Sequence, residues 1–189
     1  MRKIKIMEHI SLDGIIEQGE GYAYDNWTAA FRSPAGLEAV MEAHGNVFDL
    51  LLGRVTYDIW AGYWPHAANI PIANGINTAT KYVATHRPES LEWGPVEDLG
   101  TDIVEGVRRL KDTDGPDVIL WGSSTLTTIL LDQGLIDEVV LITYPVLLGK
   151  GKRIFSESFN ARELAFVNTK VTSTGVLINT FRHVGALKI

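Results

Sequence analysis

Short apolar runs alternate along this chain with longer segments whose apolar residues recur at helical spacing. Buried strands are predicted at residues 4–9, 48–52, 82–85, 118–121 and 139–144. Helices are predicted at residues 34–44, 101–111 and 124–133. This alternation is typical of an α/β domain with a mostly parallel sheet, because each helix can return the chain to the same end of the sheet. The last of these strands is almost wholly apolar and is therefore expected at the sheet centre.

Cap residues mark the ends of the predicted helices. Ser33 can cap the first helix with Pro34 in its first turn, and Gly45 supplies the stop. The second helix has acidic residues near its start and basic residues near its end, which complements the helix dipole. Gly134 ends the third helix. The connection at residues 88–100 lacks a regular pattern and is expected to be irregular.

The C-terminal part of the chain changes character. Residues 164–171 and 176–183 flank a Ser-Thr-Gly turn at 173–175, which predicts an antiparallel β-hairpin at one edge of the sheet. The sequence contains no internal repeat, low-complexity tract or linker. We therefore expect residues 1–189 to form a single domain.

The composition excludes several classes of protein. Hydrophobic residues make up 46% and charged residues 21% of the 189 residues, as in an ordinary folded protein. Cysteine is absent, so a disulfide framework, a thiol nucleophile and a Cys-ligated zinc are excluded. The net charge of −6 disfavours nucleic-acid binding. The sequence shows neither a signal peptide nor a membrane span, and a cytoplasmic protein without membrane partners is the simplest expectation.

The segment Val-Ile-Leu-Trp-Gly-Ser-Ser-Thr at 118–125 is the strongest local signal for a ligand. An apolar strand stops at Gly122 and meets hydroxyl residues where a helix can begin. Helix N-termini bind anions through free N–H groups, and glycine allows a phosphate to approach the backbone closely. An ordinary turn with a helix N-cap has the same composition, so both interpretations stay open here.

Several motifs occur in a specific order around this segment. They are Ser-Leu-Asp-Gly at 11–14, Leu-Gly-Arg-Val-Thr-Tyr at 52–57, Gly-Ser-Ser at 122–124, Leu-Ile-Asp-Glu at 135–138 and Pro-Val-Leu-Leu-Gly-Lys-Gly at 145–151. In this order they resemble the reductase domain of bacterial riboflavin biosynthesis, the C-terminal domain of the bifunctional deaminase-reductase. That family belongs to the dihydrofolate reductase-like superfamily. The resemblance covers nearly the whole chain and implies a three-layer α-β-α fold.

The resemblance also implies an NADPH site across the carboxyl ends of the parallel strands, where open α/β sheets bind ligands. The implied cofactor-binding residues are Gly53, Arg54, Thr56, Thr85, His86, Arg87, Gly122, Ser123, Ser124 and Thr125. Arg54 would neutralise the adenosine 2′-phosphate, with Thr85, His86 and Arg87 beside it. The alternatives are a solvated arginine at a helix start and a surface turn before Pro88.

The superfamily places paired glycines at the cofactor pyrophosphate, and in dihydrofolate reductases that joint is a non-proline cis peptide. Serine replaces the second glycine in this chain. The hypothesis that follows is a cis peptide bond between Gly122 and Ser123, which would be costly and retained for function.

The implied substrate-binding residues are Asp13, Gly14, Trp27 and Thr143. Asp13 is the candidate for assisting proton transfer, and its alternative is a turn residue that bonds its own backbone. The aromatic residues Tyr57, Trp60, Tyr63 and Trp64 could wall the substrate pocket or serve as core or subunit interface. The five histidines are scattered, and no metal site is expected. The phosphate-loop, dinucleotide-fold and Gly-x-Ser-x-Gly motifs are also missing.

The chain departs from its better-known relatives at substrate positions. Residues 33–37 lack the carboxylate that pairs with the pterin in dihydrofolate reductases, and Glu38 comes one or two positions late. Residues 42–47 lack the arginines that engage the ribose phosphate in the riboflavin pathway. Dihydrofolate reduction is therefore not expected, and a phosphoribosyl-pyrimidine substrate is disfavoured.

The function predicted on this basis is NADPH-dependent hydride transfer to a small heterocyclic, pyrimidine- or pteridine-like compound or to a carbonyl compound. The enzyme would be related to 5-amino-6-(5-phosphoribosylamino)uracil reductase. The alternative is a non-catalytic nucleotide-binding or interaction protein on the same scaffold, because a fold does not determine a function. The family resemblance also implies a homodimer, with the late hairpin and the loop at 149–151 near the contact.

Overall fold

A mixed eight-stranded sheet forms the centre of the molecule. The computed structural model describes residues 1–17, 26–67, 70–155 and 160–188. The strand order is β5-β4-β3-β6-β1-β7-β10-β9. These strands are β1 (Ile4–Ser11), β3 (Phe48–Gly53), β4 (Lys81–Ala84), β5 (Val96–Asp98), β6 (Asp117–Trp121), β7 (Glu138–Tyr144), β9 (Arg162–Val171) and β10 (Leu177–Ala186). Two further strands, β2 (Ile15–Glu17) and β8 (Lys152–Arg153), pair with each other.

The strands from β5 to β7 are all parallel, and β10 and β9 complete the sheet as an antiparallel hairpin. This arrangement confirms the predicted mostly parallel sheet with the C-terminal hairpin at one edge. Strand β7 lies inside the sheet, between β1 and β10. Both of its neighbours hydrogen-bond to it, which fits its apolar, β-branched sequence.

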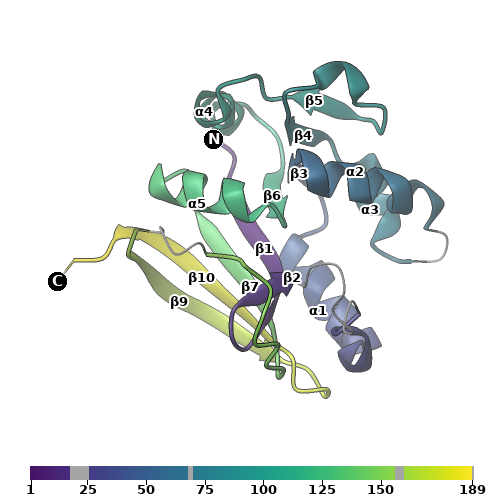
Figure 1. Ribbon diagram of the computed structural model, residues 1–189, viewed down its shortest axis with the longest axis vertical. Coiled ribbons are helices and arrows are strands. Elements are labelled where there is room, and N and C mark those ends of the chain that lie inside the picture. The colour runs from purple at the N-terminus through teal and green to yellow at the C-terminus, as the bar shows by residue number, and fades with distance from the viewer. Residues whose placement is uncertain (18–25, 68–69, 156–159, 189) are drawn as a thin grey trace.

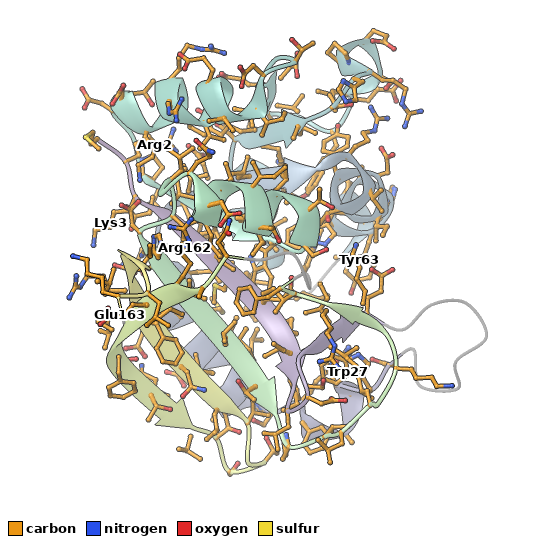
Figure 2. All side chains as sticks on the ribbon, turned by 60° about the vertical axis from the view of Figure 1, so that its left-hand side comes forward. Arg2, Lys3, Trp27, Tyr63, Arg162 and Glu163 are labelled. Carbon is orange, nitrogen blue, oxygen red and sulfur yellow. The ribbon has the colours of Figure 1, made fainter. Side chains whose placement is uncertain are left out.

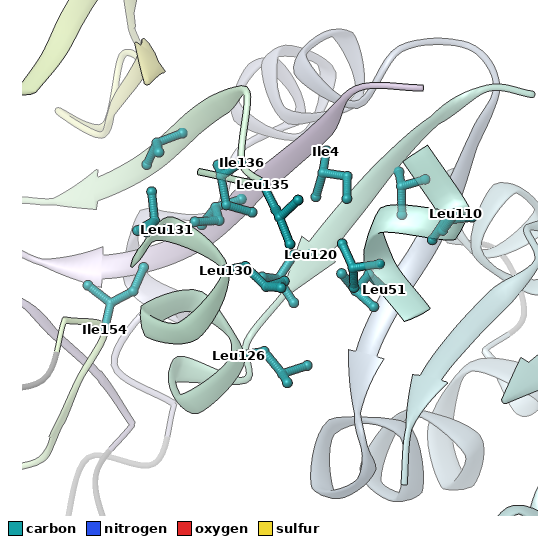
Figure 3. Close-up of a cluster of buried hydrophobic side chains, with 14 of the residues drawn as sticks. Ile4, Leu51, Leu110, Leu120, Leu126, Leu130, Leu131, Leu135, Ile136 and Ile154 are labelled. Carbon is teal, nitrogen blue, oxygen red and sulfur yellow. The ribbon is translucent and has the colours of Figure 1, made fainter. Parts of the chain in front are cut away.

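Helices cover both faces of the sheet (Figure 1). They are α1 (Pro34–His44), α2 (Arg54–Tyr63), α3 (Ala73–Thr78), α4 (Ile103–Asp112) and α5 (Ser124–Asp132), with 3-10 turns η1 (Ala29–Phe31), η2 (Trp64–His66) and η3 (Pro88–Ser90). Leu110 of α4 and Leu130 of α5 pack in one core cluster, which Figure 3 shows. Tyr57 of α2 and Ile76 of α3 pack in the other core cluster. The two clusters on opposite faces give the predicted three-layer α-β-α architecture.

The predicted cap at Ser33 and the predicted stop at Gly134 are present, and Asp102 provides a cap that the sequence analysis did not predict. The Ser33 hydroxyl accepts a hydrogen bond from Gly36 N–H at 3.0 Å and begins α1. The Asp102 carboxylate accepts one from Glu105 N–H at 3.0 Å and begins α4. Gly134 follows α5 in the left-handed region, with φ of 67°. The side chains of Ser33 and Asp102 satisfy free backbone N–H groups at the starts of their helices.

The connection at residues 88–100 is more regular than the sequence predicted. It contains the turn η3 and the strand β5, which adds a parallel edge strand beside β4. Only three residues pair, and Glu97 and Asp98 are two of them. Such a short, acidic edge strand has no apolar alternation to reveal it, because its side chains remain exposed.

Candidate functional site

Two glycines bring the carboxyl ends of β3 and β6 into close contact. Gly53 N–H donates to the Ser123 hydroxyl at 2.9 Å, and the Thr56 and Ser123 hydroxyls lie 3.1 Å apart. A Cβ atom on Gly53 would lie 2.8 Å from Ser123 Oγ, and one on Gly122 would lie 3.0 Å from Thr56 Oγ1. The strand ends can therefore approach this closely only because both positions are glycine. Four of the predicted cofactor-binding residues meet here.

The Gly122–Ser123 joint turns without a cis peptide bond, so that hypothesis is wrong. The cis bond recorded among the described residues joins Gly94 to Pro95. Gly122 and Ser123 instead both adopt the left-handed region, with φ of 60° and 56°. Two successive left-handed residues turn the chain from β6 into α5, and the Gly53 N–H bond holds the serine there. Ser124 and Thr125 follow as the first residues of α5.

A second cluster surrounds the Arg54 guanidinium at the start of α2. Its Nη1 donates to the Ser90 hydroxyl at 2.7 Å, to the Arg87 carbonyl at 3.0 Å and to the Thr85 hydroxyl at 3.4 Å. The structure thus brings together Arg54, Thr85 and Arg87, as the sequence predicted. His86 lies exposed between the last two.

Asp58 is an unpredicted member of this cluster. Its carboxylate accepts from Arg54 Nε at 2.8 and 2.9 Å and lies 3.8 Å from Arg87 Nη2. This hydrogen bond raises the pKa of Arg54 above its usual value. The i,i+4 spacing on α2 was visible in the sequence and could have identified the pair.

A cavity of about 1030 Å³ lies against the same strand ends. Its wall is mostly aromatic and aliphatic, with Trp60, Trp64, Trp121, Tyr144 and Ile142 among the lining residues. Thr56 and Gly122 also line it, so the cavity is continuous with the cluster at the glycines. This volume lies at the upper end of the range that ordinary ligand pockets occupy.

The aromatic group on α2 and η2 contributes to both predicted roles. Trp60, Tyr63 and Trp64 line the cavity. Tyr57 is instead buried in the core, where its hydroxyl oxygen accepts a hydrogen bond from Trp93 N–H at 2.7 Å. Trp27 does not line the cavity, but its ring packs edge-on against Tyr144 with 5.2 Å between centroids. Figure 2 shows Trp27 and Tyr63 on the same side of the molecule.

Glu8 is a buried acid of β1, next to His9, and the sequence analysis did not predict it as a site residue. Its Oε1 accepts from His9 N–H at 3.1 Å, and its Oε2 has no hydrogen-bond partner among the described residues. Burial raises the pKa of Glu8 to about 8. An acid inside an otherwise apolar buried strand was the available signal, because a buried carboxyl needs a partner or a proton.

Two histidines and a tyrosine surround the same cavity. His9 stacks on Trp121 with ring centroids 5.4 Å apart, and its Nδ1 lies 2.9 Å from the Tyr144 hydroxyl. Burial lowers the pKa of His9 and that of His44 to about 4, and it raises the pKa of Tyr144 to about 12. All three groups are therefore uncharged at neutral pH.

Asp13 links the loop after β1 to the loop after β7 through hydrogen bonds. Its carboxylate accepts from the Ser11 hydroxyl at 2.6 Å, from Leu148 N–H at 3.1 Å and from Gly149 N–H at 2.7 Å. The hydrogen bond from Ser11, with smaller contributions from the two backbone groups, lowers the pKa of Asp13 to about 2. An ionised carboxylate with these partners is a poor proton donor, and neither Asp13 nor Gly14 lines the cavity.

Thr143 lies outside the cavity as well. Its neighbours Ile142 and Tyr144 line the cavity, whereas the Thr143 hydroxyl accepts from Asn179 Nδ2 at 3.5 Å. Adjacent residues of a strand point to opposite faces of the sheet, so β7 turns Thr143 away from this site. Among the described residues no group of three or more His, Asp or Glu side chains could hold a metal ion. In the same part of the chain no helix is long and apolar enough to cross a membrane.

The strand order and the cavity define an α/β domain with a crevice at the carboxyl edge of its sheet. The model of the RibD C-terminal domain family matches residues 2–178. The chain belongs to that family.

Individual proteins are similar to this chain at low sequence identity, two of them by structure. The uncharacterized protein YyaP of Bacillus subtilis is 27% identical over 180 residues, which are 93% of this chain and 92% of that protein. A Thermotoga maritima diaminohydroxyphosphoribosylaminopyrimidine deaminase/5-amino-6-(5-phosphoribosylamino)uracil reductase superposes with a TM-score of 0.65 at 18% identity, covering 97% of this chain and 57% of that one. Dihydrofolate reductase from Enterococcus faecalis, solved with NADP(H), superposes with a TM-score of 0.59 at 16% identity, covering 98% and 97%.

Proposed function

We propose that this protein is an NADPH-dependent reductase that transfers a hydride to a small heterocyclic or carbonyl compound. One observation carries the proposal: Thr56 and Gly122 belong both to the cluster at the strand ends and to the wall of the aromatic cavity. A dinucleotide held at the first place can reach into the second. The relatives from T. maritima and E. faecalis are reductases by name, and the latter was solved with NADP(H).

The cofactor residues divide into two groups. Gly122 and the first turn of α5, with Ser123, Ser124 and Thr125, would hold the pyrophosphate through backbone N–H groups and hydroxyls. Gly53, whose N–H already donates to the Ser123 hydroxyl, would allow the phosphate to approach closely. Arg54, Thr85, His86 and Arg87 would hold the 2′-phosphate. Asp58 would weaken binding of the 2′-phosphate, because its carboxylate already pairs with Arg54 and repels a phosphate. The two arginines must outweigh this repulsion for NADPH to be preferred over NADH.

When bound, NADPH supplies the hydride from its nicotinamide ring. The chain's own residues would bind and orient the cofactor and the substrate. They would also exclude water from the site. The aromatic wall displaces water from the cavity, which strengthens every polar contact inside it. Trp27, Asp13 and Gly14 act indirectly in this account, through Tyr144 and through the loop at 148–149.

The cavity also bears on which substrates are excluded. Glu38 is exposed and does not line the cavity, and residues 33–37 contain no carboxylate. The chain therefore offers no acid from α1 to a pterin ring, and dihydrofolate reduction is not proposed. The described residues that line the cavity include one arginine, Arg32, which leaves little to neutralise a substrate phosphate.

A titration followed by an activity assay tests the proposal. Binding of NADPH and of NADH would be measured by quenching of tryptophan fluorescence, and oxidation of NADPH would be followed by absorbance with aminopyrimidines, pteridines and quinones. Binding with turnover of one compound class is expected. No binding of NADPH at millimolar concentration would contradict the proposal. Binding without turnover would favour the alternative, a non-catalytic nucleotide-binding or interaction protein.

We also propose that two copies of the chain form a dimer through the C-terminal hairpin. Strand β9 lies at the edge of the sheet, and its side chains Phe166, Val167 and Val171 are 64%, 53% and 67% exposed. A long edge strand with exposed apolar side chains is a common site of association.

A further inference from the structure

Most of the hydrogen-bond donors of Arg54 are already used inside the protein. Arginine has five N–H donors in a rigid plane. Arg54 Nε donates to Asp58, and Nη1 donates to the Ser90 hydroxyl and to the Arg87 carbonyl. Among the residues that the structure describes, none accepts a hydrogen bond from Nη2. Only the Nη2 end of the guanidinium is therefore open to a phosphate, and the side chain as a whole is only 18% exposed.

Asp58 pairs with both arginines of this cluster. Both oxygens of its carboxylate accept from Arg54 Nε, at 2.8 and 2.9 Å. Asp58 Oδ2 also lies 3.8 Å from Nη2 of Arg87, whose side chain is 63% exposed. The side chain of Asp58 is itself 46% exposed. Its negative charge therefore acts on any anion that approaches these arginines from solvent.

The charges of the cluster balance. Arg54 and Arg87 are positive, whereas Asp58 and Glu89, an exposed residue of η3, are negative. The hydrogen bond to Asp58 is the main cause of the raised pKa of Arg54, and the charge of Glu89 adds to it. A phosphate monoester brings close to two further negative charges at neutral pH. The two carboxylates oppose its attraction to the arginines, so the cluster gives a phosphate little net attraction.

We infer that this protein accepts NADH as well as NADPH, and that Asp58 is the residue that removes the preference for NADPH. The two nucleotides differ only at the 2′ position of the adenosine ribose, where NADH has a hydroxyl group and NADPH has a phosphate. A carboxylate repels the phosphate but can accept a hydrogen bond from the hydroxyl, as acidic residues do in dinucleotide-binding domains that use NAD. The inference rests on the proposed function, because it places this ribose at the Arg54 cluster.

Titration with both nucleotides tests the inference. Binding to the wild-type protein would be measured by quenching of tryptophan fluorescence, and the two dissociation constants should agree within about fivefold. Asp58→Asn removes the charge and keeps an oxygen that can accept from Arg54. It should raise the preference for NADPH about fivefold through tighter binding of NADPH, because one partly exposed charge beside the phosphate is lost. Binding of NADH should stay within about twofold of the wild type.

Salt distinguishes an electrostatic role of Asp58 from a structural one. In Asp58→Asn the arginines outnumber the carboxylates of the cluster, so the attraction of NADPH becomes sensitive to screening. Raising the ionic strength from about 0.05 M to about 0.5 M should therefore weaken NADPH binding more in Asp58→Asn than in the wild type.

Glu138→Gln is the matched control. It also removes a carboxylate from an ion pair, in this case with Lys3 at 3.0 Å. Glu138 is the first residue of β7, whereas Arg54 directly follows the last residue of β3. The two pairs therefore lie at opposite edges of the parallel strands. Glu138→Gln should change neither the nucleotide preference nor its dependence on salt.

Three results would each overturn the inference: a wild-type preference for NADPH greater than about fivefold, an unchanged or lower preference in Asp58→Asn, or the same gain in Glu138→Gln. If NADPH binds and Asp58→Asn leaves the preference unchanged, the inference fails alone and the proposed function stands. If the wild type binds only NADH and Asp58→Asn also binds NADPH, the proposed use of NADPH fails and the role of Asp58 stands. Binding of neither nucleotide by either protein at millimolar concentration overturns both.

Discussion

At the scale of single residues, the same side-chain type serves different purposes according to its surroundings. Asp13 is ionised and joined to backbone N–H groups, whereas Glu8 is buried with one oxygen unpaired. The pKa of the first is lowered to about 2 and that of the second is raised to about 8. The sequence drew attention to Asp13 because its motif was recognisable. Glu8 became apparent only when the burial of its side chain was known.

Replacement of Arg54 by alanine should weaken NADPH more than NADH. Arg54 lies between Asp58, Thr85 and Ser90 at the proposed 2′-phosphate position. A lost charge-assisted hydrogen bond corresponds to roughly a tenfold or greater change in affinity. Fluorescence titration with both nucleotides measures the ratio. Equal losses for the two would remove Arg54 from the 2′-phosphate site.

Replacement of Asp13 by asparagine should cost on the order of 1 kcal/mol of stability at neutral pH, after allowance for solvent screening. The folded pKa of Asp13, about 2, lies below its ordinary value of 3.8. The carboxylate therefore stabilises the fold above pH 4, and this contribution is lost as the pH falls through 2. Urea unfolding of both proteins across this range measures the difference. A difference that grows on acidification would contradict this role.

At the scale of elements, the sequence predicted what depends on local pattern. The strands of the main sheet other than β5, the cap at Ser33 and the antiparallel hairpin follow from periodicity and helix-end chemistry. Strand β5 was missed because its three residues are too short for a pattern. The predicted cis peptide bond at Gly122 was also wrong. The left-handed conformation of Ser123 depends on a hydrogen bond from Gly53, which is 70 residues away in the sequence. Contacts of that range leave no trace in one sequence.

The Gly122 joint can be tested against a matched glycine. Gly122 and Gly134 have φ of 60° and 67°, so alanine at either position meets similar backbone strain. Only at Gly122 would the added Cβ meet another group, Thr56 Oγ1 at 3.0 Å, whereas Gly134 has open space around it. Gly134→Ala should lose about 1 kcal/mol of stability from backbone strain, and Gly122→Ala should lose more because of the added contact with Thr56. Gly122→Ala should also weaken NADPH severalfold, and Gly134→Ala should not. Equal nucleotide affinity in both variants would contradict the proposed cradle.

At the scale of the whole molecule, the parallel part of the sheet carries the crevice and the C-terminal hairpin carries the proposed dimer contact. The crevice lies at the carboxyl edge of the parallel strands and is lined by residues of α1, α2 and η2. The hairpin carries exposed apolar side chains far along the sheet from the Arg54 cluster, because β9 and β4 lie near opposite edges. The site and the proposed dimer contact can therefore be changed independently.

Sedimentation should detect the dimer. Val167→Lys places a charge on the exposed edge strand and is expected to shift the protein to monomer, because an unpaired charge disrupts an apolar contact. Val47→Lys, at an even more exposed valine just before β3, is the control and should remain dimeric. A wild-type protein that sediments as a monomer at micromolar concentration would contradict the proposed interface.

The central claim is that one crevice holds the cofactor and the substrate side by side. A crystal structure of the protein with NADPH tests it most directly. The account predicts the pyrophosphate at Gly53, Ser123 and Ser124, and the nicotinamide end of the cofactor in the cavity beside Thr56 and Gly122. NADPH bound elsewhere on the protein, or with its nicotinamide end outside this cavity, would contradict the account.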